Sequence, residues 1–333
     1  MPFLLVLLAA LPLAAQPTVG SVEIFGAHKV SIDKIRKALA VNPGDPLPPS
    51  KGDVEERLEA LDGVLRARLE AWCCDQGKPV LYVGIEERGV LGRNLLPYPQ
   101  DENLALPEEI TSAYSDFSAA LARATAAGDL REDLSQGHSL LENLPARIVQ
   151  ERFTGLAELH LDILRKVLRE AAAPDQRAIA AYLLGYAPDK AAVIPELQSA
   201  LQDPDGSVRL NAARALKAIA WVALRDPSSG LKVPATWFIE MLNSIELSDR
   251  LEAVRTLMLY AGKGDENAIA GIRERALPSL FEMARWQHLS HALPAYLLLG
   301  RIYGWKDDAL EKAWAAGDRE KALRDMEKPP KKR

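Results

Sequence analysis

The sequence predicts an α+β protein that is mostly α, with a small β-α-α-β-β domain followed by an α-solenoid of stacked helix pairs. Three observations support this fold class. Hydrophobic and polar residues alternate in short segments near the amino terminus, which is the period of half-buried strands. A helix-pair pattern recurs in the second half of the chain. Alanine and leucine are abundant and aromatic residues make up only 6%, which favours closely packed helices over a sheet-rich fold.

Composition limits both the size of the protein and its function. A chain of 333 residues is long enough for about two domains, and 48% hydrophobic residues can bury substantial cores. With 41 basic and 46 acidic residues the net charge is −5, so no overall field attracts the protein to nucleic acid. Two cysteines are too few for a disulfide scaffold or a four-cysteine zinc site.

Residues 1–15 are predicted to be a signal peptide. The run from Pro2 to Leu13 is almost entirely apolar but too short to span about 30 Å of hydrocarbon as a helix. Small residues follow, which places the expected cleavage between Ala15 and Gln16. The alternative is a buried amino-terminal helix. No later run is apolar enough to span a membrane, so we expect an exported protein of the periplasm or cell envelope without a transmembrane segment in its mature chain.

The small domain is predicted over residues 18–88. It begins with a segment in which apolar and polar residues alternate, as in a half-buried strand. Two amphipathic helical segments follow, separated by proline and glycine, and two further alternating segments are joined by a turn, as in a β-hairpin. In order, these segments cover residues 21–25, 32–39, 54–61, 67–73 and 80–87.

This order and its residues resemble a POTRA domain, the polypeptide-transport-associated module, over about residues 19–88. The matching features are Val22-x-Ile24-x-Gly26, the helix from Ser31, Gly44-Asp45 between the helices, the strand after Leu65, and Val80-Leu81-Tyr82-Val83-x-Ile85-x-Glu87. The resemblance implies a three-stranded sheet under two helices that binds unfolded or extended polypeptide in the cell envelope. Such domains usually adjoin an outer-membrane barrel or a transmembrane helix. The sequence predicts neither, so we expect a recruiting or scaffolding role, in association with an outer-membrane assembly or transport component.

The resemblance also implies a partner site at one edge of the sheet. In POTRA domains the strand that corresponds to Ala67–Cys73 is often an edge that pairs with the backbone of a partner. Alternation places three aromatic side chains on the sheet face opposite the helices, where they either form a partner site or pack against the next domain of the same chain. The candidate partner-binding residues are Ala67, Arg68, Leu69, Glu70, Ala71, Trp72 and Cys73, together with Phe25 and Tyr82.

Residues 89–106 are predicted to be an extended linker because proline, glycine and polar residues gather there. Residues 107–172 form a predicted helical region whose first helix begins at Pro107 and ends near Gly128. A second, long amphipathic helix is predicted from Pro145 to Ala172. One face of that helix is expected to carry Leu156, Leu159, Ile163 and Val167.

A repeat is predicted over residues 173–316. Matching positions, separated by 32, 41 and 41 residues, are occupied by Arg177, Arg209, Arg250 and His291. Alanine or valine lies four residues after each of these positions and leucine lies seven residues after it. The repeated unit, clearest at residues 203–216, resembles a HEAT repeat of the lyase-associated type over about residues 174–314. This resemblance implies a curved solenoid whose concave surface binds protein.

Several repeat residues are expected to be structural rather than catalytic. They turn the chain, cap helices and tie neighbouring repeats together, and they are Asp203, Asp205, Arg177, Arg209 and Arg250. The last two copies are degenerate, and residues 262–265 form an inserted loop. After the repeats, residues 317–333 are expected to form a basic tail that is largely disordered.

The sequence predicts no catalytic, cofactor-binding or metal-binding residues. His288 and His291 are three residues apart and could share one helix face, but no third metal ligand is apparent. The motifs HExxH, GxSxG and GxGxxG do not occur in the sequence. Glu86 and Glu87 end a predicted strand and are expected to be solvated.

Cys73 and Cys74 are adjacent on a predicted strand. Neighbouring strand residues point to opposite faces, so a bond between the two sulfurs would strain the peptide. Two interpretations stay open. One is a redox switch or an intermolecular bridge, and the other is one buried and one partly exposed cysteine.

Together these observations predict an exported, non-enzymatic adaptor or scaffold of the cell envelope. It would bind protein or extended polypeptide by strand addition at the edge of the POTRA-like domain and by the concave surface of the solenoid. One alternative is a helical protein of the lyase-associated type that handles a cofactor or small ligand. Another is a structural envelope protein in which the POTRA-like domain is only a cap.

Overall fold

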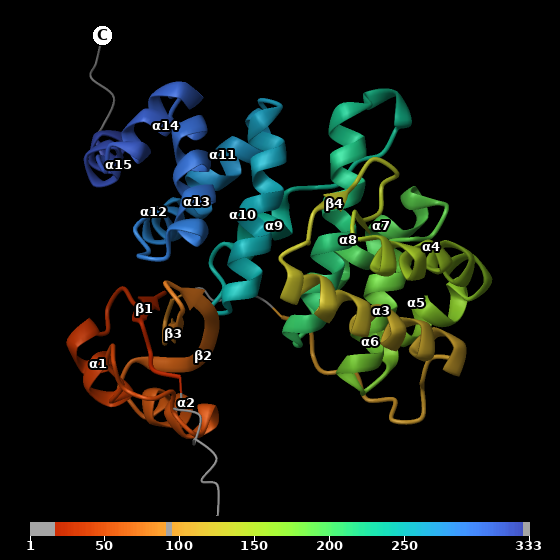
Figure 1. The fold of residues 1–333 in the computed structure, drawn as a ribbon, viewed down its shortest axis with the longest axis horizontal. Coiled ribbons are helices and arrows are strands. Elements are labelled where there is room, and N and C mark those ends of the chain that lie inside the picture. The colour runs from red at the N-terminus through yellow and green to blue at the C-terminus, as the bar shows by residue number, and fades with distance from the viewer. Residues whose placement is uncertain (1–16, 91–94, 329–333) are drawn as a thin grey trace, which may run out of the picture. The chain divides into compact units, whose positions relative to one another are not determined.

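The computed structural model describes residues 17–90 and 95–328. The chain divides between Arg88 and Gly89 into two compact units, which are described separately below (Figure 1). The predicted signal peptide, residues 1–15, lies outside the described residues. Among the helices that the structure describes, none is long and apolar enough to cross a membrane.

The amino-terminal unit has the predicted β-α-α-β-β order. Its elements are β1 (Ser21–Phe25), α1 (Ile32–Leu39), α2 (Lys51–Glu59), β2 (Val64–Asp75) and β3 (Lys78–Glu87). The sheet order is β1-β3-β2, with β1 parallel and β2 antiparallel to the central strand β3. Gln76 and Gly77 form the two-residue turn between β2 and β3, and both have the positive φ (50° and 79°) that such hairpin turns require.

The core of this unit lies between one face of the sheet and the two helices. Alternate residues of β3 supply the sheet side, and apolar residues of α1 and α2 supply the other. The central members of this core are Leu81, Val83 and Ile85 from β3 with Ile35, Leu39, Val54 and Leu58 from the helices. The inward face of β3 predicted from alternation is therefore confirmed.

Glu87, at the end of β3, is buried rather than solvated, so that expectation is wrong. Its carboxylate accepts hydrogen bonds from the backbone N–H groups of His28, Lys29 and Val30 at 2.7–3.0 Å. Burial alone would raise the pKa of Glu87, but the three N–H donors and His28 outweigh it and lower the pKa. The carboxylate thus closes the turn between β1 and α1.

In the second unit, the regular elements that the structure describes are helices, one short hairpin and a 3-10 turn. The hairpin strands are β4 (Glu132–Asp133) and β5 (Leu140–Leu141), and the turn covers Pro227–Ser229. The helices are α3 (Glu108–Ala127), α4 (Leu144–Leu159), α5 (Leu161–Glu170), α6 (Pro174–Leu184), α7 (Lys190–Ala200), α8 (Gly206–Arg225), α9 (Thr236–Met241), α10 (Leu247–Gly262), α11 (Glu266–Arg275), α12 (Leu277–Ala284), α13 (Leu289–Ile302), α14 (Asp307–Ala315) and α15 (Arg319–Glu327).

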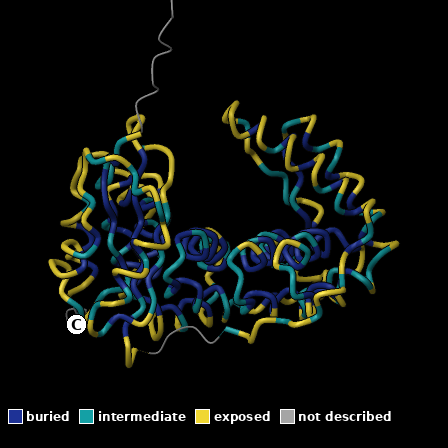
Figure 2. Tube along the Cα trace, turned by 90° about the horizontal axis from the view of Figure 1, so that it is seen from below, coloured by how far each residue is buried: buried dark blue, intermediate teal, exposed yellow. Residues whose placement is uncertain are grey.

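Stacked helix pairs form the body of this unit. Helices α6, α8, α10 and α13 pack against one another in sequence, and each also packs against the helix before it, namely α5, α7, α9 and α12. The four matching positions of the predicted repeat lie one on each of these inner helices. Figure 2 shows in dark blue how strongly the helices are buried where they pack. The fourth copy contains the additional helix α11, which begins directly after the loop at residues 262–265.

The predicted helix from Pro145 to Ala172 is wrong, because the chain forms two helices there. Helix α4 ends before His160, whose backbone is no longer helical (φ −114°, ψ 20°), and α5 begins at Leu161. The predicted apolar face is also wrong, since Leu159 is 72% exposed whereas Phe153 and Ala157 are buried. The main partner of each helix differs, since α4 packs chiefly on α3 and α5 chiefly on α6.

Residues 317–333 were predicted to form a largely disordered tail. This prediction is wrong for residues 319–327, because Arg319–Glu327 forms helix α15. Leu323 and Met326 of this helix are buried. On its exposed side, Glu320 and Glu327 both pair with Arg285, at 3.1 and 2.9 Å. Residues 329–333 lie outside the described residues. Apolar contacts with the preceding helices, among them α13 and α14, thus order a segment whose composition alone indicates a solvated tail.

The second half of the predicted linker (residues 89–106) is hydrogen-bonded to the helical unit. The Leu96 N–H donates to the Gln202 carbonyl at 2.8 Å. The Asp101 N–H donates to the carbonyl of Glu170, the last residue of α5, and the Asp101 carbonyl accepts from the Ala172 N–H on the loop before α6. From residue 96 onward, the segment is therefore part of the helical unit.

Candidate protein-interaction sites

The outer edge of β2 is the first candidate site, because β2 is an edge strand of the described sheet, with β3 on its inner side. The N–H groups of Ala67 and Leu69 point to the outer edge, since both donate to side chains of α2. Backbone direction repeats every second residue along a regular strand, so the N–H of Ala71 also points to the outer edge.

Two glutamates of α2 occupy the first half of this edge. Glu59 Oε1 accepts from the Ala67 N–H at 3.0 Å, and Glu55 Oε1 accepts from the Leu69 N–H at 2.7 Å. Hydrogen bonds to charged acceptors are stronger than those between neutral groups. A partner strand would have to displace both carboxylates to pair here. The accessible part of the edge therefore begins at Ala71, and residues 71–74 are all exposed.

The side chains of the predicted edge site fall into different environments. Ala67 and Leu69 belong to the buried core. The side chains of Arg68 and Glu70 are partly exposed, and Arg68 lies 3.8 Å from Glu59. Only the last three residues of the predicted set, from Ala71 to Cys73, form a continuous exposed run.

The three outer-face aromatic residues are also separated by the fold. Trp72 is 42% exposed, whereas Phe25 and Tyr82 are each 1% exposed. The rings of Phe25 and Tyr82 meet edge-to-face with centroids 6.5 Å apart. Burial, with added repulsion from Glu23 and Asp75, raises the pKa of the Tyr82 phenol. Of the three, only Trp72 presents substantial surface to a partner.

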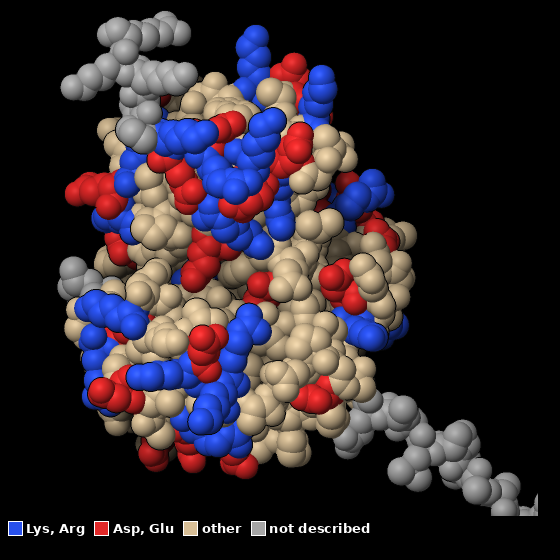
Figure 3. Space-filling view, turned by 90° about the vertical axis from the view of Figure 1, so that its left-hand side faces the viewer, with Lys and Arg blue, Asp and Glu red and all other residues tan. Residues whose placement is uncertain are grey.

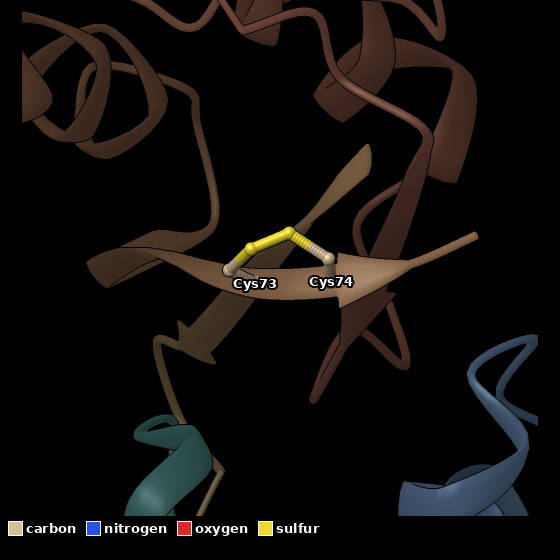
Figure 4. Close-up of a disulfide and its surroundings, with 2 residues drawn as sticks. All are labelled: Cys73 and Cys74. Atoms are coloured by element: carbon tan, nitrogen blue, oxygen red, sulfur yellow. A yellow bond between two sulfur atoms is a disulfide. The ribbon is translucent and has the colours of Figure 1, made fainter. Parts of the chain in front are cut away.

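Cys73 and Cys74 are joined by a disulfide bond (Figure 4). The interpretation of two unbonded cysteines, one of them buried, is wrong, since both residues are exposed and bonded to each other. Figure 4 shows the two sulfurs on one side of the β2 ribbon. The strand departs from regular pairing at this point, because the register shifts by one residue between Trp72↔Val80 and Asp75↔Lys78.

The second candidate site is the solenoid, whose repeats are connected by buried arginines. Arg177 on α6 is fully buried and holds Asp203 with two parallel hydrogen bonds of 2.9 Å. Its remaining Nη1 group donates to the carbonyls of Ala171 and Ala172, also at 2.9 Å. One side chain thus ties the loop before α6 to the loop before α8.

Arg209 on α8 repeats this arrangement one copy further on. It contacts Asp249 at 3.0–3.1 Å and Glu246 at 2.7 Å, and it donates to the carbonyls of Asp203 and Pro204. Burial would lower the pKa of Arg209, but the two carboxylates outweigh it and raise the pKa.

Arg250 on α10 continues the series. It donates to the Ser244 carbonyl at 2.6 Å and pairs with Glu282 at 2.7 Å, and burial lowers its pKa. We call Arg177, Arg209 and Arg250, with their carboxylates, the arginine ladder. Asp205 caps α8 by accepting from the Ser207 and Val208 N–H groups.

The fourth matching position, His291, carries no guanidinium. Its ring lies 4.1 Å from that of His288, centroid to centroid. Burial, followed by the nearby His288 and Arg255, lowers the pKa of His291 to about 3. Among the described residues, no group of three or more His, Cys, Asp or Glu side chains is placed to hold a metal ion.

Part of the inner-helix surface is covered by the chain itself. Asn211 on α8 donates to the Tyr114 hydroxyl of α3, and Lys217 on α8 lies 3.5 Å from Glu132 of the β4–β5 hairpin. Rings from α3, α4 and α6 pack together nearby, namely Tyr114, Phe117, Phe153 and Tyr182. A partner on this side of the solenoid must therefore bind next to the segment from α3 to α4 rather than directly to α6 and α8.

Helix α4 carries an exposed apolar stripe on the side away from these rings. Leu144, Ile148 and Leu159 are 65, 55 and 72% exposed and lie within one narrow sector of the helix. The opposite sector, which includes Phe153 and Gln150, is buried. We call Leu144, Ile148 and Leu159 the α4 stripe. Sequence reasoning missed it because the buried and exposed apolar residues of this helix are indistinguishable by composition.

A buried polar network and a pocket were also missed from the sequence. The Gln150 amide N–H₂ donates to the hydroxyls of Tyr182 and Tyr186 at 2.9 and 3.0 Å. The pocket, of about 460 Å³, lies between residues 96–99 and helices α5 and α7, and is mostly apolar. The concentration of proline at residues 97–99 was the only signal for it, and that signal indicates a linker equally well.

Charges on the surface are mixed. On the face that Figure 3 displays, Lys and Arg side chains are interspersed with Asp and Glu. This pattern accords with the small net charge of −5.

Residues 161–232 match a family model of HEAT repeats. The match covers α5 to α8, with the loop that follows α8, and therefore includes the Arg177 and Arg209 steps of the arginine ladder. A comparison with curated proteins finds no match. The chain is thus a helical repeat protein in this region, with stacked pairs that continue beyond the matched residues.

Proposed function

We propose that this protein is an exported, non-enzymatic adaptor or scaffold of the cell envelope that binds polypeptide. The amino-terminal unit, which resembles a POTRA domain in its element order, would take an extended segment by strand addition. The observation that carries this proposal is the exposed outer edge of β2 from Ala71 onward, on the side of the strand away from β3. Strand addition draws its affinity from backbone hydrogen bonds, which an edge of this kind offers to any extended chain.

The helical unit would supply a second, more rigid binding surface. HEAT repeats at residues 161–232 support a role in protein interaction, since such solenoids present extended surfaces to partners. The arginine ladder fixes the spacing of the inner helices, and the α4 stripe exposes three large apolar side chains together. Apolar groups clustered on a surface are typical of protein contact sites.

A substitution at Ala71 tests the strand-addition part of the proposal. Proline at this position removes the outward N–H but is compatible with an edge strand, because that N–H faces away from β3. Ala71→Thr is the matched control, since it keeps the N–H and suits a strand. We expect Ala71→Pro to abolish capture of the strand-bound partner from envelope extract by tagged 16–333, while Ala71→Thr captures it normally. Equal capture by both variants would exclude this edge as the site.

The α4 stripe is tested in the same way. Ile148→Asp and Leu159→Asp replace exposed side chains, so the fold should be unaffected while contacts of the stripe with a partner are lost. The matched control is Thr154→Asp, which adds the same charge at a half-exposed position of the same helix outside the stripe. We expect the stripe variants alone to lose the partner of the helical unit. Retention of every partner would exclude the stripe.

A second function, the handling of a small ligand, is favoured by the pocket between residues 96–99 and α5 and α7. Its volume of about 460 Å³ and apolar lining suit a small apolar molecule. Ser199 is exposed at its wall, so Ser199→Trp should fill the pocket without disturbing the core. A ligand found by native mass spectrometry in the unaltered protein and absent from Ser199→Trp would favour this function over a pure adaptor.

A further inference from the structure

The pocket beside α5 and α7 has one wall, residues 97–99, that is fixed at both of its ends. Before this wall, the Leu96 N–H donates to the Gln202 carbonyl at 2.8 Å, and after it Asp101 is bonded to the end of α5 and to the loop that follows. Two of the three wall residues are prolines, which restrict the backbone. The space is therefore largely preformed, as ligand pockets usually are.

Apolar side chains line the inner part of this pocket. Leu168 of α5 and Ala200 of α7 are 4 and 5% exposed, and Pro195 and Pro204 lie beside them in the lining. Contact with these groups removes the apolar part of a ligand from water, which is favourable. The inner part of the pocket thus suits a hydrocarbon chain.

The two carboxylates of the pocket wall are already paired with arginines. Asp203 accepts two hydrogen bonds of 2.9 Å from Arg177. Glu196 Oε1 lies 3.0 Å from Arg165 on α5, and the other oxygen of Glu196, Oε2, is buried and not presented to a ligand. A cationic ligand would be repelled by the same arginines that hold these carboxylates. The wall therefore does not favour a cation.

Arg169, in the last turn of α5, is the cation that lines the pocket. Its side chain is 56% exposed, and the neighbouring Glu170 lies 3.8 Å away, beyond hydrogen-bond distance. Ser199 of α7 lines the same pocket and is also exposed, so its hydroxyl can donate a hydrogen bond. An arginine and a hydroxyl together suit an anion, above all a carboxylate, which a guanidinium binds with two parallel hydrogen bonds.

We propose that this pocket binds an amphiphile with one hydrocarbon chain and one carboxylate, that is, a medium-chain fatty acid. The chain lies against Leu168 and Ala200, and the carboxylate meets Arg169. Because Arg169 is exposed, the carboxylate stays close to water and avoids the cost of burying a charge. This inference rests on the small-ligand function proposed above and names the class of ligand.

The test compares three probes of equal chain length on the full chain by isothermal titration calorimetry. Decanoate carries the carboxylate, decanol is neutral and decylammonium is cationic. We expect decanoate to bind most tightly and decylammonium most weakly. Arg169→Gln should weaken decanoate binding roughly tenfold, the effect of losing hydrogen bonds between charged groups, and leave decanol binding unchanged. The matched control is Arg131→Gln, which removes the same charge at an exposed position outside the pocket and should bind decanoate normally.

Ser199→Trp separates failure of the ligand class from failure of the pocket. Equal binding of decanoate and decanol that Arg169→Gln leaves unchanged and Ser199→Trp abolishes would overturn the carboxylate and leave the small-ligand function intact. Decanoate binding that Ser199→Trp leaves unchanged would overturn both. An equal loss in Arg169→Gln and Arg131→Gln would overturn the role of Arg169. No binding of decanoate would overturn the ligand class, and the native mass spectrometry described above then decides the small-ligand function independently. An unchanged temperature of thermal unfolding controls for the fold of each variant.

Discussion

At the sites described above, charged side chains of the two units meet opposite backbone groups. In the amino-terminal unit, carboxylates accept from backbone N–H groups, with Glu55 and Glu59 on the edge of β2 and Glu87 on the turn before α1. In the helical unit, guanidinium groups donate to backbone carbonyls of the loops between helices, as Arg177 and Arg209 do.

The difference follows from the architecture of each unit. A sheet leaves N–H donors at its edges, where an anion satisfies them and keeps a second strand away. Stacked helices leave carbonyl acceptors at the end of each helix, where a cation satisfies them. Because each arginine also pairs with a carboxylate of the following repeat, the ladder connects repeats as well as satisfying carbonyls. In both units the charged side chains satisfy backbone groups that would otherwise lack a partner. At the sheet edge this hinders a further strand from pairing, and between the helices it connects neighbouring repeats.

The largest effect is expected from breaking the ladder. Arg209→Ala leaves Asp249, which is 0% exposed, without its cation, and removal of one partner of a buried pair costs about 3–5 kcal/mol. Chemical denaturation followed by hydrogen exchange should locate this loss in the helical unit, with the β3 amides unchanged. Arg209→Met combined with Asp249→Ala should restore part of the stability. A loss below about 1 kcal/mol would show that the ladder does not hold the repeats together.

A core truncation in the other unit gives the matching measurement. Leu81 is 1% exposed and lies between the sheet and both helices, so Leu81→Ala should cost about 2–5 kcal/mol. Hydrogen exchange should increase in β1, β2 and β3 while α6 and α8 stay protected. Equal loosening of both units would show that the two compact units do not unfold independently.

A smaller effect is expected from Glu87→Gln, which keeps the shape but removes the charge that three N–H groups share. The expected loss at neutral pH is about 1–3 kcal/mol. Because the pKa of Glu87 is lowered on folding, its contribution is complete above the ordinary carboxyl pKa and disappears as the pH falls through the lowered value. Urea denaturation of the variant should therefore differ from that of the unaltered protein at pH 7 but converge with it in strong acid. A constant difference across this range would argue against the charged cap.

The smallest effect is expected at the surface pairs of α15. Arg285→Ala removes contacts with Glu320 and Glu327, all three of which are substantially exposed. Exposed pairs contribute about 0.2–1 kcal/mol and are screened by salt. The loss should appear in low-salt denaturation and decrease in 1 M salt, a concentration at which the Debye length is about 3 Å. A large, salt-independent loss would instead place Arg285 in the same class as the ladder arginines.

Signals carried by residues close together in the sequence predicted the hairpin, the end of α3 and the inner helices of the stack. Alternation and turn residues predicted the β2–β3 hairpin, and Gly128, with its positive φ of 70°, ends α3 where the sequence indicated. The spacing of the arginines located the inner helices of the stack. Prediction failed at His160 and at residues 319–327, because the break and the helix there depend on which distant helices each segment packs against.

The candidate site was less predictable than the fold. The resemblance to a POTRA domain implied an edge strand at residues 67–73. Glu55 and Glu59 reach that edge from α2, and nothing in their spacing reveals the contact. Trp72 and Tyr82 share a predicted face, yet one is exposed and the other is buried. The disulfide between Cys73 and Cys74 contradicts the pleat alternation on which the sequence argument relied.

The sequence by itself determined the two-part organisation, the order of the amino-terminal elements and the repeat in the helical unit. Periodicity, turn residues and spacing are local properties, and the elements that they specify form wherever the chain can bury one face. Only the tertiary structure decided which charges are buried, how much of the β2 edge is accessible and where α4 ends. These features depend on contacts between residues far apart in the chain, because a carboxylate or a guanidinium is stable in the interior only when a distant partner meets it.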